Sequence, residues 1–140
     1  MAELWVCPLC GNSFAGKNMA HSCGRFDLDA LFARSDPNVR AVFDRLADAV
    51  RKIGDVTVIP QKTRATFQSR VRFLSVYPRR KALLAGIWLR HPLEHPRFRK
   101  VEHFGGTNFV HEVLLSDPAE IDAELLSWVR EAREAGLVYR

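Results

Sequence analysis

The hydrophobic residues of this chain change their spacing at Gly54, and this change limits the fold to a mixture of helices and strands. Before Gly54 they recur every three or four residues, as on one side of a helix: Val39, Val42, Phe43, Leu46, Val50 and Ile53. After Gly54 they form short runs rich in β-branched and aromatic residues, separated by Pro, Arg-Arg and Gly-Gly. The sequence therefore predicts an α+β domain.

The helical stretch has recognisable ends. Asp36 stands at the N-cap position, Pro37 in the first turn and Gly54 just beyond the last turn, so we expect a core helix of about 17 residues. A shorter helix is expected from about Asp27 to Arg34, with Leu28, Leu31 and Phe32 on one side. It would connect the N-terminal segment to the main domain.

The runs after Gly54 predict an antiparallel sheet of about five strands, within VTVIP, RATFQS, VRFLSVYP, KALLAGIWLR and NFVHEVLL. A second main helix is expected over DPAEIDAELLSWVREAREAG, with Asp117 as N-cap and Gly136 at its end. Its buried side would carry Ile121, Leu125, Trp128, Val129 and Ala132. The expected fold is thus a sheet flanked by two main helices and preceded by a small zinc-binding finger.

The three cysteines all lie near the N-terminus, in CPLCGNSFAGKNMAHSC. An odd number of thiols cannot pair completely as disulfides, whereas Cys7, Cys10, His21 and Cys23 together make a Cys3His set suited to tetrahedral zinc. Four protein ligands leave no coordination position for water, so one structural zinc per chain is expected. The alternative is a set of reduced thiols beside a surface histidine.

These features divide the chain into three parts: a zinc-finger-like segment over 1–25, a helical connector over 26–36 and the α+β domain over 37–140. The first part has few large apolar residues, so metal binding would have to stabilise it. Its central GNSFAGKNMA contains a single basic residue, Lys17, and is therefore a poor candidate for reading DNA.

Positive charge is concentrated in the middle of the chain. Residues 60–103 carry a net charge of +9, whereas the whole chain carries +5. This asymmetry indicates an anionic partner, of which nucleic acid is the commonest, through a basic sheet region. The candidate ligand-binding residues are Lys62, Arg64, Arg70, Arg72, Arg80 and Arg90. The alternative is a solvated basic edge that prevents aggregation.

No catalytic motif is evident, and a non-enzymatic binding module is the leading hypothesis, although an enzyme stays open. The second hypothesis is an enzyme or small-anion sensor with a pocket around Lys62, Arg64 and the His91–His103 loop. Pro92 and Pro96 argue against one continuous helix that presents His91 and His95 to a metal. A broad exposed basic face would favour the first hypothesis, and convergence of Lys62, Arg64, His95 and His103 the second.

No apolar run is long enough to span a bilayer, and the N-terminus lacks the features of a secretory signal. We therefore expect a cytoplasmic protein with no membrane partner.

Several stretches together resemble a known family: CPLCG, HSCGRF, VTVIPQKTRATFQSRVRF, IWLRHPLEHPRF and ELLSWVREA. They resemble the bacterial family called domain of unknown function 5655, in the subset with an N-terminal zinc-finger-like extension. The resemblance covers essentially the whole chain and implies an α+β domain, without an activity that can be assigned to residues. The order of helix, antiparallel sheet and helix is also similar to the frataxin-like layout, but an acidic iron-binding ridge is missing.

Overall fold

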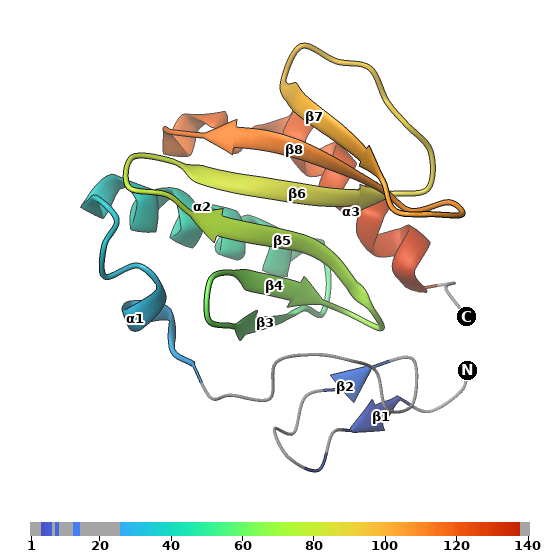
Figure 1. Ribbon diagram of the computed structural model, residues 1–140, viewed down its shortest axis with the longest axis horizontal. Helices are drawn as coiled ribbons and strands as arrows, with labels where there is room; N and C mark the ends of the chain where they lie inside the picture. The colour runs from blue at the N-terminus through green and yellow to red at the C-terminus, as the bar shows by residue number, and fades with distance from the viewer. Residues whose placement is uncertain (1–3, 7, 9–12, 15–25, 138–140) are drawn as a thin grey trace.

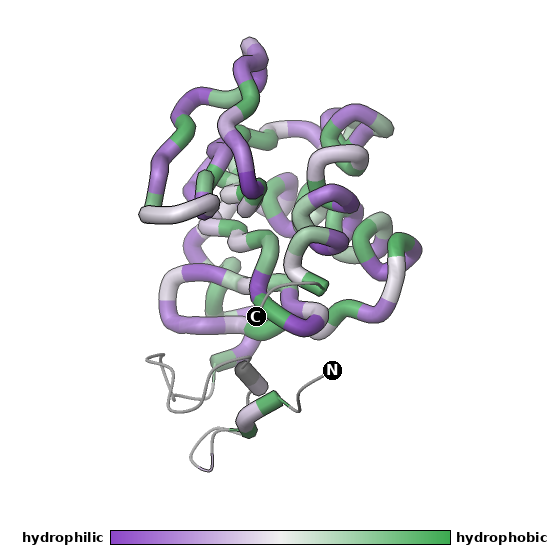
Figure 2. The backbone as a smooth tube through the Cα atoms, turned by 90° about the vertical axis from the view of Figure 1, so that its right-hand side faces the viewer, coloured by the Kyte–Doolittle hydropathy of each residue, from purple (hydrophilic) through white to green (hydrophobic). Residues whose placement is uncertain are grey.

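Two helices cover one face of a six-stranded antiparallel sheet in the computed structural model, which describes residues 4–6, 8, 13–14 and 26–137 (Figure 1). Figure 2, turned by 90°, shows the helices and the sheet as two layers seen edge-on. The other face of the sheet carries no helix among the described residues. The predicted α+β class is therefore confirmed.

The strands follow one another as hairpins except at the end of the sheet. They are β3 (Thr57–Pro60), β4 (Ala65–Gln68), β5 (Arg72–Pro78), β6 (Leu83–Leu89), β7 (Phe98–His103) and β8 (Phe109–Leu115). Their order in the sheet is β3-β4-β5-β6-β8-β7, so β8 is inserted between β6 and the edge strand β7.

The sheet has six strands where the sequence predicts about five. The additional strand is β7, which lies in the histidine-rich stretch after Pro92 and was not predicted. β7 pairs with β8 alone, and its Arg99 and Lys100 are exposed. A charged edge strand lacks the apolar alternation by which strands are recognised, although the charges suit its position because they discourage pairing with other chains.

The helix α2 (Pro37–Ile53) has the predicted bounds. Asp36 stands at its N-cap position, but its side chain makes no capping hydrogen bond. The apolar stripe of α2 is buried, and Phe43 lies between Phe32 and Phe67, with ring centroids 4.9 and 6.0 Å away. The connecting helix α1 (Leu28–Leu31) is shorter than predicted, and Asp27 caps it by accepting a hydrogen bond from the N–H of Ala30.

The closing helix differs from its prediction at both ends. Asp117 does begin a capping box, but the box closes only a short 3-10 turn, η1 (Pro118–Glu120). The helix α3 (Ala123–Leu137) starts later because the carboxylate of Asp122 accepts the N–H of Leu125 at 2.9 Å and forms a second start. Gly136 lies within α3, where a Cβ would come within 2.8 Å of Val71. It therefore permits close packing instead of ending the helix.

The core lies between the helices and the sheet. Four of the five residues predicted for the inner side of α3 are buried, and Trp128 is half-buried. Its ring packs on Phe98 at 4.5 Å and on His95 at 5.0 Å between ring centroids. α3 packs mainly against β5 and β6.

The N-terminal strands β1 (Trp5–Val6) and β2 (Ser13–Phe14) form a separate two-stranded antiparallel sheet. The four predicted zinc ligands Cys7, Cys10, His21 and Cys23 lie outside the described residues. Within the part of the chain that the structure describes, no helix is both long and apolar enough to cross a membrane.

Candidate functional site

The face of the sheet that no described helix covers carries a row of directly opposed residues: Thr66, Ser75, Gly86, Glu112 and Lys100, from β4 to β7. The middle positions, Ser75 and Gly86, are small. Because larger residues on the same strands stand on both sides of this row, the face is hollowed along its centre. Trp88 stands on one side, and Tyr77 on the other.

Arg64 is held over this face by a polar network. Its Nε donates to Oε1 of Gln61 at 2.9 Å, and its Nη1 donates to the hydroxyl of Tyr77 at 3.0 Å. Oε1 of Gln61 also accepts from the hydroxyl of Thr66 at 2.8 Å, and Gln61 itself is buried. A guanidinium has five N–H donors, so Arg64 is oriented by its neighbours while retaining donors for a ligand.

A first cavity of about 350 Å³ begins at Arg64 and continues around β5 to the C-terminal turns of α3. Cavities of this size accommodate small ligands. Its charged lining consists of three arginines, Arg64, Arg72 and Arg90, and none of the described lining residues is a carboxylate. Its polar lining includes Thr66, Gln68, Ser75 and Asn108. This arrangement is suited to an anionic group.

Gln68 contributes an unusual group to the first cavity. Its Nε2 donates to the carbonyl of Ser13 at 2.5 Å, which links the N-terminal hairpin to β4. Its Oε1 is buried and has no hydrogen-bond partner in the described part of the chain. A buried acceptor is normally satisfied, so this oxygen marks a position where a donor on a ligand would be stabilised.

Arg90 has a structural role beside its place in the cavity. Its Nη2 donates to the carbonyl of Ala135 at 2.8 Å, in the last turn of α3. A cation there offsets the negative end of the helix dipole.

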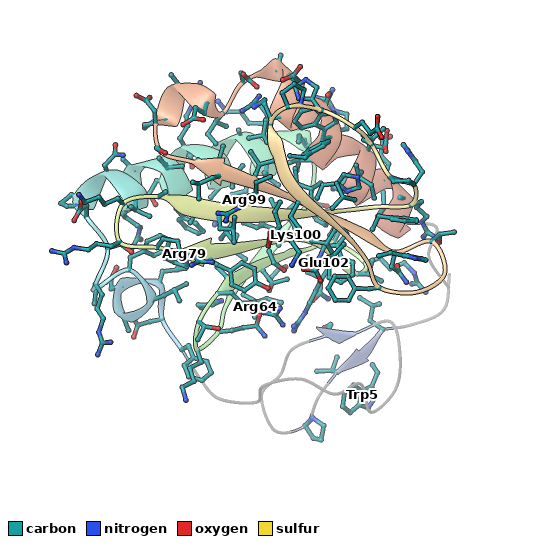
Figure 3. All side chains as sticks on the ribbon, turned by 45° about the horizontal axis from the view of Figure 1, so that its top comes forward. Trp5, Arg64, Arg79, Arg99, Lys100 and Glu102 are labelled. Carbon is teal, nitrogen blue, oxygen red and sulfur yellow. The ribbon has the colours of Figure 1, made fainter. Side chains whose placement is uncertain are left out.

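A second cavity of about 430 Å³ occupies the centre of the open face. Arg64 and Arg79 line one wall, while Glu102 and Glu112 line the opposite wall on β7 and β8. Figure 3 shows Arg64, Arg79 and Glu102 gathered over the same face of the sheet. Trp88 and Phe104 also line this cavity, with ring centroids 5.6 Å apart. The charge of the open face is therefore uneven: cations line the β4–β5 side, whereas on the β7–β8 side Lys100 is ion-paired with Glu102 and lies opposite Glu112.

A third hollow lies beyond Arg79, between the α1–α2 connection and the β3–β4 turn. Its basic residues are Arg34, Lys62, Arg79 and Arg80, with Asp36 as the carboxylate among its lining residues. Two hydrogen bonds join the α1–α2 connection to the turn that follows β5. The hydroxyl of Ser35 donates to the carbonyl of Arg79 at 2.8 Å, and the N–H of Asp36 donates to the carbonyl of Arg80 at 2.7 Å.

The six ligand-binding candidates from the sequence are thus divided. Arg64, Arg72 and Arg90 meet in the first cavity, and Lys62 and Arg80 line the third hollow. Arg70 is half-buried between β4 and β5 and is not among the residues that line these three sites.

The histidines of the second hypothesis, an enzyme or small-anion sensor, lie elsewhere. His91 contacts Glu131 at 3.0 Å and His95 contacts Glu124 at 3.1 Å, both on α3 and therefore on the helix-covered side. His103 contacts the carbonyl of Gly106 at 2.8 Å in the β7–β8 turn. His91 and His95 therefore lie on the helix-covered side, away from Arg64 on the open face. Within the described ranges no cluster of three His, Cys, Asp or Glu residues could hold a metal ion.

Sequence reasoning missed the aromatic and polar residues of the open face. Tyr77, Trp88 and Phe104 looked like ordinary strand or core residues. A signal was present in RATFQ, where Arg64, Thr66 and Gln68 alternate with apolar residues and so share one face of a strand. The signal identifies one strand's contribution but not the strands beside it.

Comparison with known proteins places this fold in one family. The family described as domain of unknown function (DUF5655) matches residues 28–135, which include all six strands of the main sheet and the helix α2. No curated protein and no solved structure matches the chain.

Proposed function

The chain belongs to the domain of unknown function family DUF5655, and for this member we propose a non-enzymatic role as a module that binds an anionic ligand on the open face of its sheet. The observation that carries the proposal is the meeting of Arg64, Arg72 and Arg90 in one cavity whose described lining contains no carboxylate. Arginines bind phosphate and carboxylate groups through paired N–H donors, which makes this cavity favourable for such ligands.

The composition of the cavity also supports binding without catalysis. General acid–base chemistry uses a histidine, a carboxylate or a similar group close to the reacting atoms. The described lining of the first cavity has none of these, and its hydroxyl groups come from Ser13, Thr66, Ser75 and Thr107 without a histidine beside them. His91 and His95 are paired with glutamates on α3 instead.

The proposal includes one structural zinc ion in the N-terminal segment, held by Cys7, Cys10, His21 and Cys23. The pairing of β1 with β2 supports it, because Cys7 and Cys10 lie in sequence between Val6 and Ser13, which are direct partners in the hairpin. A Cys-x2-Cys pair joining two short strands is a common way to present two thiolates to zinc. We set the protein in the cytoplasm, where thiols stay reduced and able to bind metal.

The test is a titration of the full chain with a fluorescein-labelled oligothymidylate at low salt, with inorganic pyrophosphate as competitor. Arg64→Gln should weaken binding, because it removes a charge from the cavity. Arg45→Gln is the matched control: Arg45 is exposed on α2, on the opposite side of the sheet, and its loss should leave affinity almost unchanged.

A salt series completes the test. If phosphates are contacted, the logarithm of affinity should fall with that of salt at a slope of about −0.7 to −0.9 per contact, and Arg64→Gln should reduce that slope by about one. Failure of both anions to bind at low salt, or an equal loss in the Arg45 and Arg64 variants, would refute the proposal.

A further inference from the structure

We propose that the ligand is single-stranded nucleic acid, laid along the open face with its phosphates on Arg64 and Arg79 and its bases against Trp88 and Phe104. This inference rests on the proposed function, and it names the ligand class of the same site.

The first reason is that the three hollows form one track. Arg64, Ser75 and Trp88 line both the first and the second cavity, and Arg79 lines both the second cavity and the third hollow. The two arginines therefore stand at the two junctions. A small anion would occupy one cavity, whereas a chain of phosphates would meet a cation at each junction and further ones at the ends.

The second reason is an aromatic surface on this track. Phe104 is 56% exposed, which is unusual for a large apolar side chain, and it lies beside Trp88 in the lining of the second cavity. Bases of a single strand stack on exposed aromatic residues of a sheet, and each such contact contributes appreciably to affinity. Gly86 leaves room for a ligand in the second cavity because it has no side chain; even a Cβ at this position would lie 3.1 Å from Val110.

The third reason is the uneven distribution of charge. A uniformly basic face would accept a polyanion in any orientation. Here Arg64 and Arg79 attract phosphates to one wall of the second cavity. On the β7–β8 wall Lys100 is ion-paired with Glu102 and lies opposite Glu112, so the charges there largely offset one another. The backbone of the strand is thereby held on one side, and the bases project towards the aromatic residues.

The fourth reason is Oε1 of Gln68, which is buried, has no hydrogen-bond partner among the described residues and can accept a hydrogen bond from a ligand. Ionised phosphates have acceptors only, whereas nucleobases carry N–H groups. A ligand with both phosphates and N–H donors satisfies the arginines and Gln68 together. Duplex DNA meets these requirements poorly, because its bases are already stacked inside the helix.

The experiment compares three probes of equal length by fluorescence anisotropy and competition: single-stranded oligothymidylate of twelve nucleotides, the same oligonucleotide without bases, and inorganic polyphosphate. The natural protein should bind the oligothymidylate most tightly. Phe104→Ala should weaken that binding about five- to 150-fold, the range expected for one stacked base. It should leave the two probes without bases unaffected. Because Phe104 is exposed, its truncation should not unfold the domain, and a thermal melt checks this.

Arg79→Gln should weaken all three probes, whereas Arg45→Gln should weaken none. If the probe without bases or polyphosphate binds as tightly as oligothymidylate, or if Phe104→Ala has no effect, the inference fails while the anion-binding function stands. Preference for the matching duplex over the single strand would also overturn it. If none of the probes binds, the proposed function fails as well.

Discussion

The backbone N–H of Leu93 donates a hydrogen bond to Nε2 of His111 across 3.0 Å. His111 is completely buried on β8, and its Nδ1 lies 3.2 Å from the carbonyl of Phe109, so the proton of the neutral ring is on Nδ1. The imidazole therefore joins the loop before β7 to the strand β8. Its packing against Phe98, at 4.9 Å between ring centroids, fixes the ring further.

Burial lowers the pKa of His111 below its ordinary value, despite the opposing influence of nearby carbonyls. In the unfolded chain His111 takes up a proton near pH 6.5, before the folded protein does. Stability should therefore be complete above about pH 6.5 and fall as the pH decreases, by at most about 1.4 kcal/mol per pH unit for this one proton.

Urea unfolding between pH 7.5 and pH 5 checks the prediction. His111→Gln is the matched variant, since glutamine retains an acceptor for Leu93 but does not titrate there. Its stability should depend less on pH than that of the natural protein. The same pH dependence in both proteins would assign the effect to other groups.

Trp128→Ala should destabilise the domain by about 2–3 kcal/mol. This is less than the roughly 3–5 kcal/mol for a large aromatic that is fully buried, because Trp128 is half-buried against Phe98 and His95. Denaturant midpoints measure the loss. Trp128→Phe keeps a ring in place and should cost less than half as much, so an equal loss in the two variants would mean that packing on Phe98 is not the cause.

Asp122→Ala should cost about 1–2 kcal/mol, as is usual for loss of an N-cap. The N–H of Leu125, and then the guanidinium of Arg97, hold the pKa of Asp122 below its ordinary value, which shows that the carboxylate is stabilised in its charged form. Asp122→Asn retains a capping acceptor but removes the charge opposite Arg97. If urea unfolding shows the Asn variant to be as unstable as the Ala variant, the pair with Arg97 matters more than the cap.

Purified full-length protein should contain close to one zinc ion per chain by elemental analysis. Cys10→Ser or Cys23→Ser should remove it and loosen roughly the first 25 residues, because a segment with so few apolar residues depends on the metal. Far-ultraviolet circular dichroism should show α2 and the main sheet still folded. If protein isolated without chelators contains no zinc, the predicted zinc site is wrong. If the cysteine variants lose the whole fold, the α+β domain does not fold independently of the N-terminal segment, contrary to the predicted domain division.

Elements with a strong local pattern could be predicted from the sequence. The bounds of α2 follow from an apolar stripe, a proline in the first turn and a glycine beyond the last, all of them within one stretch of chain. β7 could not be recognised, since its place at the sheet edge and its pairing with β8 make it a strand despite Arg99 and Lys100. The start of α3 was misplaced because Asp117 and Asp122 are both good caps, and tertiary packing decides between them.

Only part of the candidate site could be predicted from the sequence. Arg64 was identified from its charge, but its partner Tyr77 lies on β5 and meets it only through the register of the sheet, and its partner Gln61 meets it through the β3–β4 turn. The same limit applies to Trp88 and Phe104, which lie on different sides of the β7 strand in sequence and meet only through the folding of the β7–β8 hairpin.

The insertion of β8 between β6 and β7 has a consequence for how the chain folds during synthesis. β3 to β6 are successive hairpins, so they can pair as soon as they leave the ribosome. β7 emerges next, but its partner β8 has not yet been synthesised. Until then β6 is an edge strand, paired on one side with β5 only. Pairing of β8 with both neighbours then completes the sheet in one step. The charges of Arg99, Lys100 and Glu102 on the waiting strand discourage its association with other nascent chains during that interval.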